Sequence, residues 1–121
     1  KLIDFLIQRH SEPLLDYFKN YSGTIKNPVG LITRATNQFN ILHKLLCHEG
    51  NATDILRKVW PPVLGKNKDR LIETSKVWNK IDLENALQIL HKIDFTLRAN
   101  SKISSKTLLI TGFLEICLLN N

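Results

Sequence analysis

The sequence has no methionine, only two cysteines and no apolar run long enough to cross a membrane. A membrane-spanning helix needs about 20 consecutive apolar residues. The apolar run at residues 2–7 is interrupted by Asp4 and ends at Gln8, so it is also too short for a signal peptide. We therefore expect no membrane contact. Because the chain starts at a lysine and lacks methionine, we expect residues 1–121 to be one domain of a longer chain.

The two cysteines are expected to be reduced. Cys47 and Cys117 lie far apart in the sequence, and each falls within an apolar helical pattern. Disulfides are typical of secreted proteins and rare in the cytosol. We interpret both cysteines as core residues of a protein in a reducing compartment, which predicts a cytoplasmic location.

Motifs for cofactor binding and catalysis are also scarce. Neither the G-x-x-x-x-G-K-[ST] nor the G-x-G-x-x-G phosphate-binding loop occurs. The five glycines are expected at helix ends and turns, apart from Gly112. A glycine at position 112 would allow two helices to approach closely. His43 and Cys47 are four residues apart, with His48 adjacent, which could supply half of a metal site. No second pair exists, so we expect no cofactor, no metal and no catalytic residue; a small helical enzyme using His43 and Cys47 is a remote alternative.

Helical periodicity is what the sequence has in abundance. The clearest pattern lies between residues 78 and 97, where apolar residues recur at steps of three and four, and Asp82 is the expected N-cap. Its apolar positions are Leu83, Ala86, Leu87, Leu90, Ile93 and Leu97. Similar patterns at residues 2–7, 11–21, 31–46, 51–60, 70–78 and 106–119, with no strand-like alternation, predict an all-α, compact bundle of five to six helices.

Caps and one helix face can be predicted more closely. Ser11, Asn51 or Thr53, and Ser104 or Ser105 are the expected N-caps of three further helices. The last helix is apolar in nearly every direction, which predicts either a central position or a place in a subunit interface. The candidate interface residues are Leu109, Phe113 and Ile116.

Most of the positive charge falls in one segment. Between residues 55 and 80 there are seven lysines or arginines and two acids, which accounts for +5 of the net charge of +6. The candidate basic patch consists of Arg57, Lys58, Lys66, Lys68 and Arg70, extended by Lys76 and Lys80. With Trp60 and Trp78 nearby, such a surface could bind nucleic acid through phosphate contacts and base stacking. The alternative is a solvated helix surface whose tryptophans anchor the core, and the position of Trp78 on the apolar side favours it.

A further set of residues matches a family pattern. The set comprises Asn27-Pro28-Val29 opening the third helix, Trp60-Pro61-Pro62-Val63, Trp78, Leu83, Ala86-Leu87, Leu90, Asp94, Leu97-Arg98 and the leucine-rich last helix. Over essentially its whole length the chain resembles the C-terminal domain of the delta subunit of bacterial DNA polymerase III, part of the clamp loader. It departs from that pattern at Leu64-Gly65-Lys66, where the family commonly has aromatic and basic residues.

The resemblance implies a helical collar domain that joins delta to the other clamp-loader subunits in a hetero-pentameric ring. The missing N-terminal domains would have the AAA+ type of fold and would carry the contact with the sliding clamp. The parent chain would be a subunit of the DNA-directed DNA polymerase III holoenzyme, a nucleotidyltransferase complex, while this domain would have no enzymatic activity and no small-molecule substrate. Primer-template DNA within the complex would lie below the collar, which makes Arg98, Asn100, Ser101 and Lys102 a candidate DNA-facing loop; an exposed polar turn is the alternative.

The sequence thus supports two functional hypotheses of different classes. The first is an oligomerisation module that assembles the clamp loader during DNA replication. The second is a free-standing basic helical domain that binds DNA or RNA. Salt dependence separates them, because binding through six or more phosphate contacts weakens about 10³–10⁵-fold between 50 and 200 mM salt, whereas burial of apolar helix faces is far less sensitive.

Overall fold

The described part of the chain is entirely helical. The computed structural model describes residues 2–20, 27–47, 50–59, 61–99 and 104–119, and these segments contain seven helices and no strand. The helices are α1 (Leu2–Ile7), α2 (Ser11–Lys19), α3 (Pro28–Cys47), α4 (Ala52–Lys58), α5 (Gly65–Ser75), α6 (Lys80–Arg98) and α7 (Ser105–Cys117). The predicted all-α class is confirmed. The helix count is seven rather than five to six, since each of the short patterns near residues 2–7 and 51–60 forms a separate helix, as do the five longer ones.

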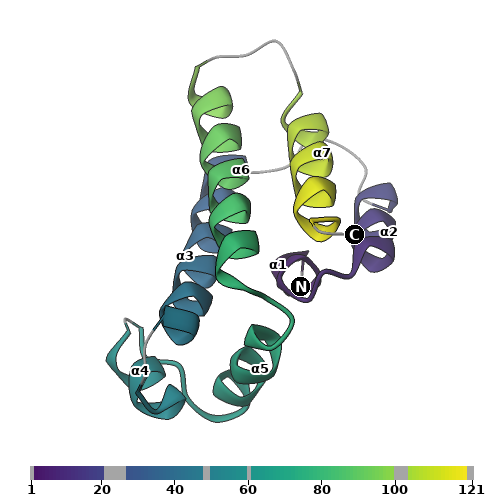
Figure 1. Cartoon of the computed structure of the whole chain (residues 1–121). Helices are drawn as coiled ribbons and strands as arrows, with labels where there is room; N and C mark the ends of the chain where they lie inside the picture. Colours follow the sequence, from purple (N-terminus) through teal and green to yellow (C-terminus); the bar gives the residue numbers. More distant parts are fainter. Residues whose placement is uncertain (1, 21–26, 48–49, 60, 100–103, 120–121) are drawn as a thin grey trace.

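Helices α3 and α6 form the backbone of the fold. They pack side by side along much of their length, α7 lies against α6, and α1 and α2 cover α7 (Figure 1). The stripe predicted for α6 faces this core: Leu83, Ala86 and Leu90 are fully buried and Ile93 nearly so. The facing stripe of α3 is equally buried and consists of Leu31, Ile32, Ala35, Phe39 and Leu42. Both stripes follow the helical period, so each helix turns one apolar face inward.

Helix α7 occupies a central position, which explains why its sequence is apolar on several sides. It contacts α6, α2 and α1, and its buried residues are Leu109, Gly112, Phe113, Ile116 and Cys117. A β-carbon at Gly112 would meet Ile93 of α6 at both Cδ1 and Cγ1, the latter at 3.0 Å. The absent side chain therefore lets α7 approach α6 closely, as expected from the sequence.

Two of the predicted N-caps are confirmed and two are wrong. The side chains of Asn51 and Ser104 accept hydrogen bonds from the amides of Thr53 (2.8 Å) and Thr107 (3.1 Å). Ser11 is already helical, and His10 stands at the cap position of α2 without a side-chain cap bond.

The predicted cap of α6 is also displaced. The cap is Asn79, whose Oδ1 accepts a hydrogen bond from the Asp82 amide at 2.8 Å. The helix starts at Lys80, three residues earlier than expected from a cap at Asp82, so Asp82 lies in the first helical turn, where it is buried.

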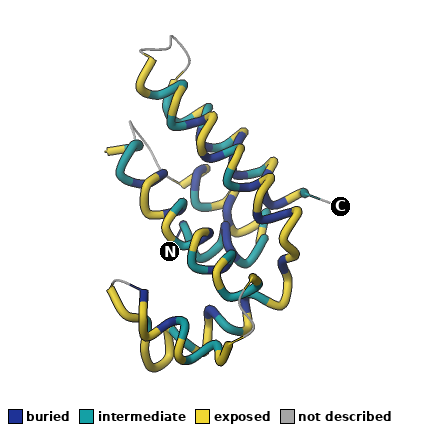
Figure 2. Tube along the Cα trace, turned by 60° about the vertical axis from the view of Figure 1, so that its left-hand side comes forward, coloured by how far each residue is buried: buried dark blue, intermediate teal, exposed yellow. Residues whose placement is uncertain are grey.

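Helix α5 begins five residues earlier and ends three residues earlier than the predicted 70–78. It starts at Gly65, which has a φ of +65°, a region that favours glycine, and its first turn contains Lys66, Asn67 and Lys68. That turn has no apolar residue from which a helical period could be recognised. Helices α4 and α5, with the Pro61–Val63 segment, form a lobe, here called the α4–α5 lobe, at one end of α3 (Figure 1). Most of its residues are exposed or half-buried (Figure 2).

Trp78 anchors the junction between the lobe and α6. Its side chain is 5% exposed, its ring packs edge-on against Phe39 with centroids 5.1 Å apart, and its Nε1 donates a hydrogen bond to the Ile7 carbonyl at 2.7 Å. The interpretation of Trp78 as a core residue is confirmed. Trp60 lies outside the described residues.

Candidate functional site

Two of the basic residues predicted to form one patch, Arg70 and Lys58, line different hollows. Arg70 points toward α1, where it lies 3.4 Å from the Asp4 carboxylate, and it lines a hollow shared by α1, α3 and α5. Lys58 lines a different hollow, together with Lys44 of α3 and the start of α4. Arg57 is exposed and 4.0 Å from Asp54. Arg70 and Lys58 therefore face different hollows of the surface.

Acidic neighbours reduce the positive charge further. Arg57, Arg70 and Lys76 each have a carboxylate partner, and the Lys76–Glu73 contact is 3.0 Å. Such exposed pairs contribute little to stability, about 0–1 kcal/mol, but they lower the local potential that would attract a phosphate backbone. Lys66 is exposed and Lys68 half-buried, both in the first turn of α5.

The candidate DNA-facing loop is described only at Arg98. Asn100, Ser101 and Lys102 lie outside the described residues. Arg98 is exposed and its Nε donates to both carboxylate oxygens of Asp94 at 3.1 Å, which is a helical pair four residues apart. Arg98 therefore has a carboxylate partner within its own helix.

The candidate interface residues belong to the core of this chain. Leu109, Phe113 and Ile116 are each 0% exposed. As the chain is folded here, their side chains offer no surface to a partner, so the prediction of an interface at these three residues is corrected. The physical reason is that α1, α2 and α6 already cover α7.

His43 and Cys47 lie close together at the surface. The Cys47 Sγ is 3.5 Å from His43 Nδ1, and His43 Nε2 is 3.6 Å from a carboxylate oxygen of Glu84. Cys47 is exposed, which corrects its interpretation as a core residue. His48 is outside the described residues, and among the residues that are described no group of three or more potential ligands is placed to hold a metal ion.

A polar cluster around Arg9 was not predicted from the sequence. Arg9 has a φ of 60°, and its guanidinium lies 4.7 Å from the ring centroid of Trp78 and 3.2 Å from the carboxylate of buried Asp82. It also donates to the carbonyls of Val77 and Leu119. This single side chain joins the end of α1 to the start of α6 and to the residues that follow α7. Its partners are separated from it by 68 to 110 positions, so no local pattern could reveal them.

Exposed apolar side chains form a second feature that the sequence did not predict. Ile81 is 68% and Phe95 70% exposed, at opposite ends of the outward face of α6. Because Arg9 binds the carbonyls of both Val77 and Leu119, the end of α7 lies beside the start of α6. Val77 and Leu118, both more than half exposed, add to the apolar surface there.

Comparisons with protein-family models, with curated proteins and with solved structures found no match to this chain. Within the described segments, no helix is both long and apolar enough to span a membrane.

Proposed function

We propose that this chain is an oligomerisation domain of the clamp-loader collar type, from a protein resembling the delta subunit of bacterial DNA polymerase III. In this proposal its role is to join the other subunits of the ring that loads the sliding clamp on primed DNA. The chemistry of replication would reside elsewhere in that complex.

The arrangement of the residues that carry the resemblance supports the proposal. Pro28 opens α3, the Pro61–Val63 segment connects α4 to α5, and Trp78 anchors the turn before α6. These residues occupy structural junctions, as expected if they specify a fold rather than a reaction. The resemblance thus rests on the framework of the domain.

The observation that carries the proposal is the outward face of α6. Ile81 and Phe95 are 14 residues apart, which corresponds to about 21 Å along a helix, and both lie on a stripe that also contains Asn85, Gln88 and Lys92. An interface that buries about 800 Å² per partner is wide enough to cover both side chains. Aromatic side chains are enriched among residues that dominate binding energy, and polar residues around them are usual. The two exposed apolar side chains on this face therefore support the proposal of an assembly surface.

Assembly with the other clamp-loader subunits tests the proposal. We expect Phe95→Asp and Ile81→Asp each to weaken assembly about tenfold or more, because each places a charge where an apolar contact is buried. Asn85→Asp is the matched control, since it adds the same charge to an exposed position between them. Size-exclusion chromatography with light scattering measures the complex, and circular dichroism shows whether the fold is intact. If both apolar variants assemble like the control, this face is not the interface.

Nucleic-acid binding is tested in parallel. The isolated chain is titrated with primed DNA at 50 and 200 mM salt. Tight binding at low salt that weakens about 10³–10⁵-fold at high salt, with no assembly with clamp-loader subunits, would replace the collar proposal with the basic-domain alternative.

A further inference from the structure

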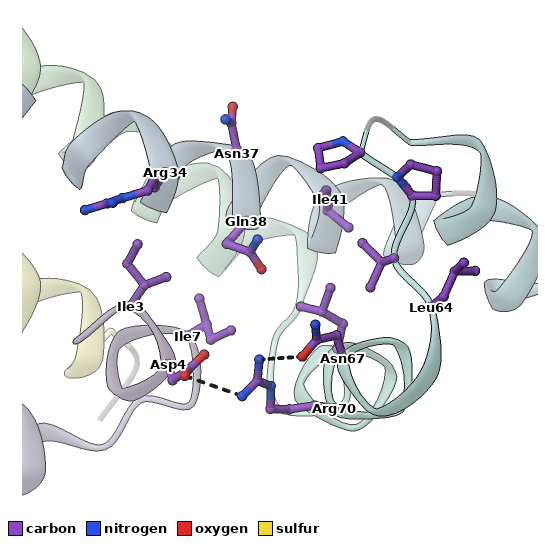
Figure 3. Close-up of a pocket in the computed structure, with 14 residues that line it drawn as sticks. Ile3, Asp4, Ile7, Arg34, Asn37, Gln38, Ile41, Leu64, Asn67 and Arg70 are labelled. Carbon is purple, nitrogen blue, oxygen red and sulfur yellow. Dashed lines mark hydrogen bonds and ion pairs between the residues drawn. The ribbon is translucent and has the colours of Figure 1, made fainter. Parts of the chain in front are cut away.

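A groove separates α1 and α5 from α3, and the Pro61–Leu64 segment lies at one end of it (Figure 3). Its volume is about 560 Å³, within the range of about 300–1,000 Å³ typical of ligand sites. No residue of the proposed assembly face of α6 lines this groove. The groove is therefore separate from the surface on which the proposed function rests.

The α3 wall of the groove is a helical stripe. Arg34, Asn37, Gln38 and Ile41 follow one another at steps of three, one and three residues and line the same groove. From Arg34 to Ile41 the stripe is about 10 Å long. That length matches three to four residues of an extended chain at about 3.3 Å per residue.

On the opposite wall, polar side chains from α1 and α5 are bound to one another. Arg70 of α5 contacts Asp4 of α1 at 3.4 Å and donates to Asn67 Oδ1 at 3.1 Å (Figure 3). The carboxylate of Asp4 is therefore already engaged within its own wall. Arg34, at the other side of the groove, contacts no carboxylate of the described residues and is exposed.

The remaining lining suits a peptide better than a nucleobase. No hydrogen bond joins the amides of Asn37 and Gln38 to another residue drawn in Figure 3. A side-chain amide both donates and accepts, as the backbone of an extended peptide requires of its partner. Apolar contacts are provided by Ile3, Ile7, Ile41, Val63 and Leu64. Among the described lining residues none is aromatic, so a stacking platform for bases is not part of this wall.

Charge defines the peptide further. The groove has two arginines and one aspartate. Among the described residues that line it, Arg34 is the only cation without a carboxylate partner. We propose that this groove binds a short extended segment of a partner protein, with a carboxylate at Arg34 and apolar side chains between α3 and the Pro61–Leu64 segment. The peptide backbone would hydrogen-bond the amides of Asn37 and Gln38. The inference is independent of collar assembly, because it involves α1, α3 and α5 rather than the outward face of α6.

The test uses a defined probe. A blocked eight-residue peptide in which aspartate and leucine alternate is titrated into the ¹⁵N-labelled chain and followed by NMR. We expect amide shifts confined to α1, the 34–41 stretch of α3 and the 61–71 segment. Arg34→Gln should weaken binding about fivefold, the effect of losing an exposed charge pair. Asn37→Asp should weaken it by a similar factor, because it sets a second carboxylate against the peptide.

Matched controls make the test decisive. Arg57→Gln removes the same charge from α4, outside the groove, and should leave the affinity unchanged. The same peptide with asparagine in place of aspartate should bind about fivefold more weakly to the unmodified chain. The proposal is overturned by equal effects of the two arginine variants, by equal affinity for the neutral peptide, or by the absence of shifts at about millimolar peptide. Stronger binding of a single-stranded oligonucleotide at the same amides would instead make the groove a phosphate site.

Discussion

The helical bundle and the α4–α5 lobe are held together in different ways. Helices α3, α6 and α7 each bury five residues, whereas α4 buries one and α5 two. Since burial of apolar surface provides about 25 cal/mol per Å², the bundle accounts for most of the hydrophobic stabilisation. The lobe depends on a few buried anchors such as Leu56 and Leu71, and the partly exposed Arg70–Asp4 pair adds little. The two regions are therefore expected to differ in how they respond to mutation and in how easily they open.

The largest expected effect comes from a charge in the bundle core. Phe113 is fully buried and packs near Phe18, with ring centroids 6.3 Å apart. Phe113→Asp removes that packing and buries a carboxylate, and the combined loss is expected to exceed about 5 kcal/mol, enough to unfold a typical domain. Urea titration followed by circular dichroism measures it. Phe95→Asp, on the exposed face of α6, is the control and should change stability by less than about 0.5 kcal/mol; similar losses for the two variants would contradict the burial pattern.

The next largest effect tests whether the bundle is also fixed by polar contacts. Arg9→Met removes the guanidinium, and with it the contact with the Trp78 ring, the ion pair with buried Asp82 and the donor to the Val77 and Leu119 carbonyls. We expect a loss of about 3 kcal/mol in the free energy of unfolding, because a buried carboxylate loses its charge partner. Chemical denaturation measures the loss. Arg57→Met removes an exposed pair and should change stability by at most about 1 kcal/mol; an equal effect would show that the Arg9 cluster contributes no more than a surface pair.

The difference between these regions also explains which features could be predicted from the sequence. The stripes of α3 and α6 and the caps at Asn51 and Ser104 are local patterns, and the structure confirms them. The Arg9 cluster and the groove could not be predicted, because they join polar residues from distant segments that share no period. Likewise, α5 begins in a polar turn without apolar residues.

The last helix could not be placed from the sequence for a different reason. A stripe that packs inside one chain and a stripe that packs against another chain have the same period and composition. The sequence therefore allows Leu109, Phe113 and Ile116 either a central position or a subunit interface, and in the structure they lie in the core. The exposed apolar residues, such as Ile81 and Phe95, stand alone among polar residues on one helix face. They form no repeating pattern, so their exposure could not be predicted from the sequence.

A mutation in the α4–α5 lobe should have a moderate effect on stability. Leu56 is the single buried residue of α4, and the carbonyl of Leu56 accepts a hydrogen bond from the Val63 amide at 2.9 Å. We expect Leu56→Ala to remove about 2 kcal/mol, mainly by making the lobe easier to open. Hydrogen exchange should then show amide protection in α4 and α5 reduced about 30-fold, with α6 unchanged. Equal loss of protection in α6 would show that lobe and bundle unfold as one unit.

The last expected effect is a pH dependence confined to the bundle, and it is absent near neutral pH. Burial of Cys117 raises the pKa of its thiol from 9.0 to about 11, although the nearby Arg9 charge lowers it in part. Between pH 9 and 11 the unfolded chain would lose this proton while the folded chain keeps it, so the free energy of unfolding falls as the pH rises. One proton corresponds to at most about 1.4 kcal/mol per pH unit. In a Cys47→Ala background, the stability difference between the chain and its Cys117→Ala variant should therefore be constant below pH 9 and shrink toward pH 11. A difference that stays constant across that window would show that the thiol ionises equally in the folded and unfolded chain, and the end of α7 would then be more open to solvent than the bundle around it.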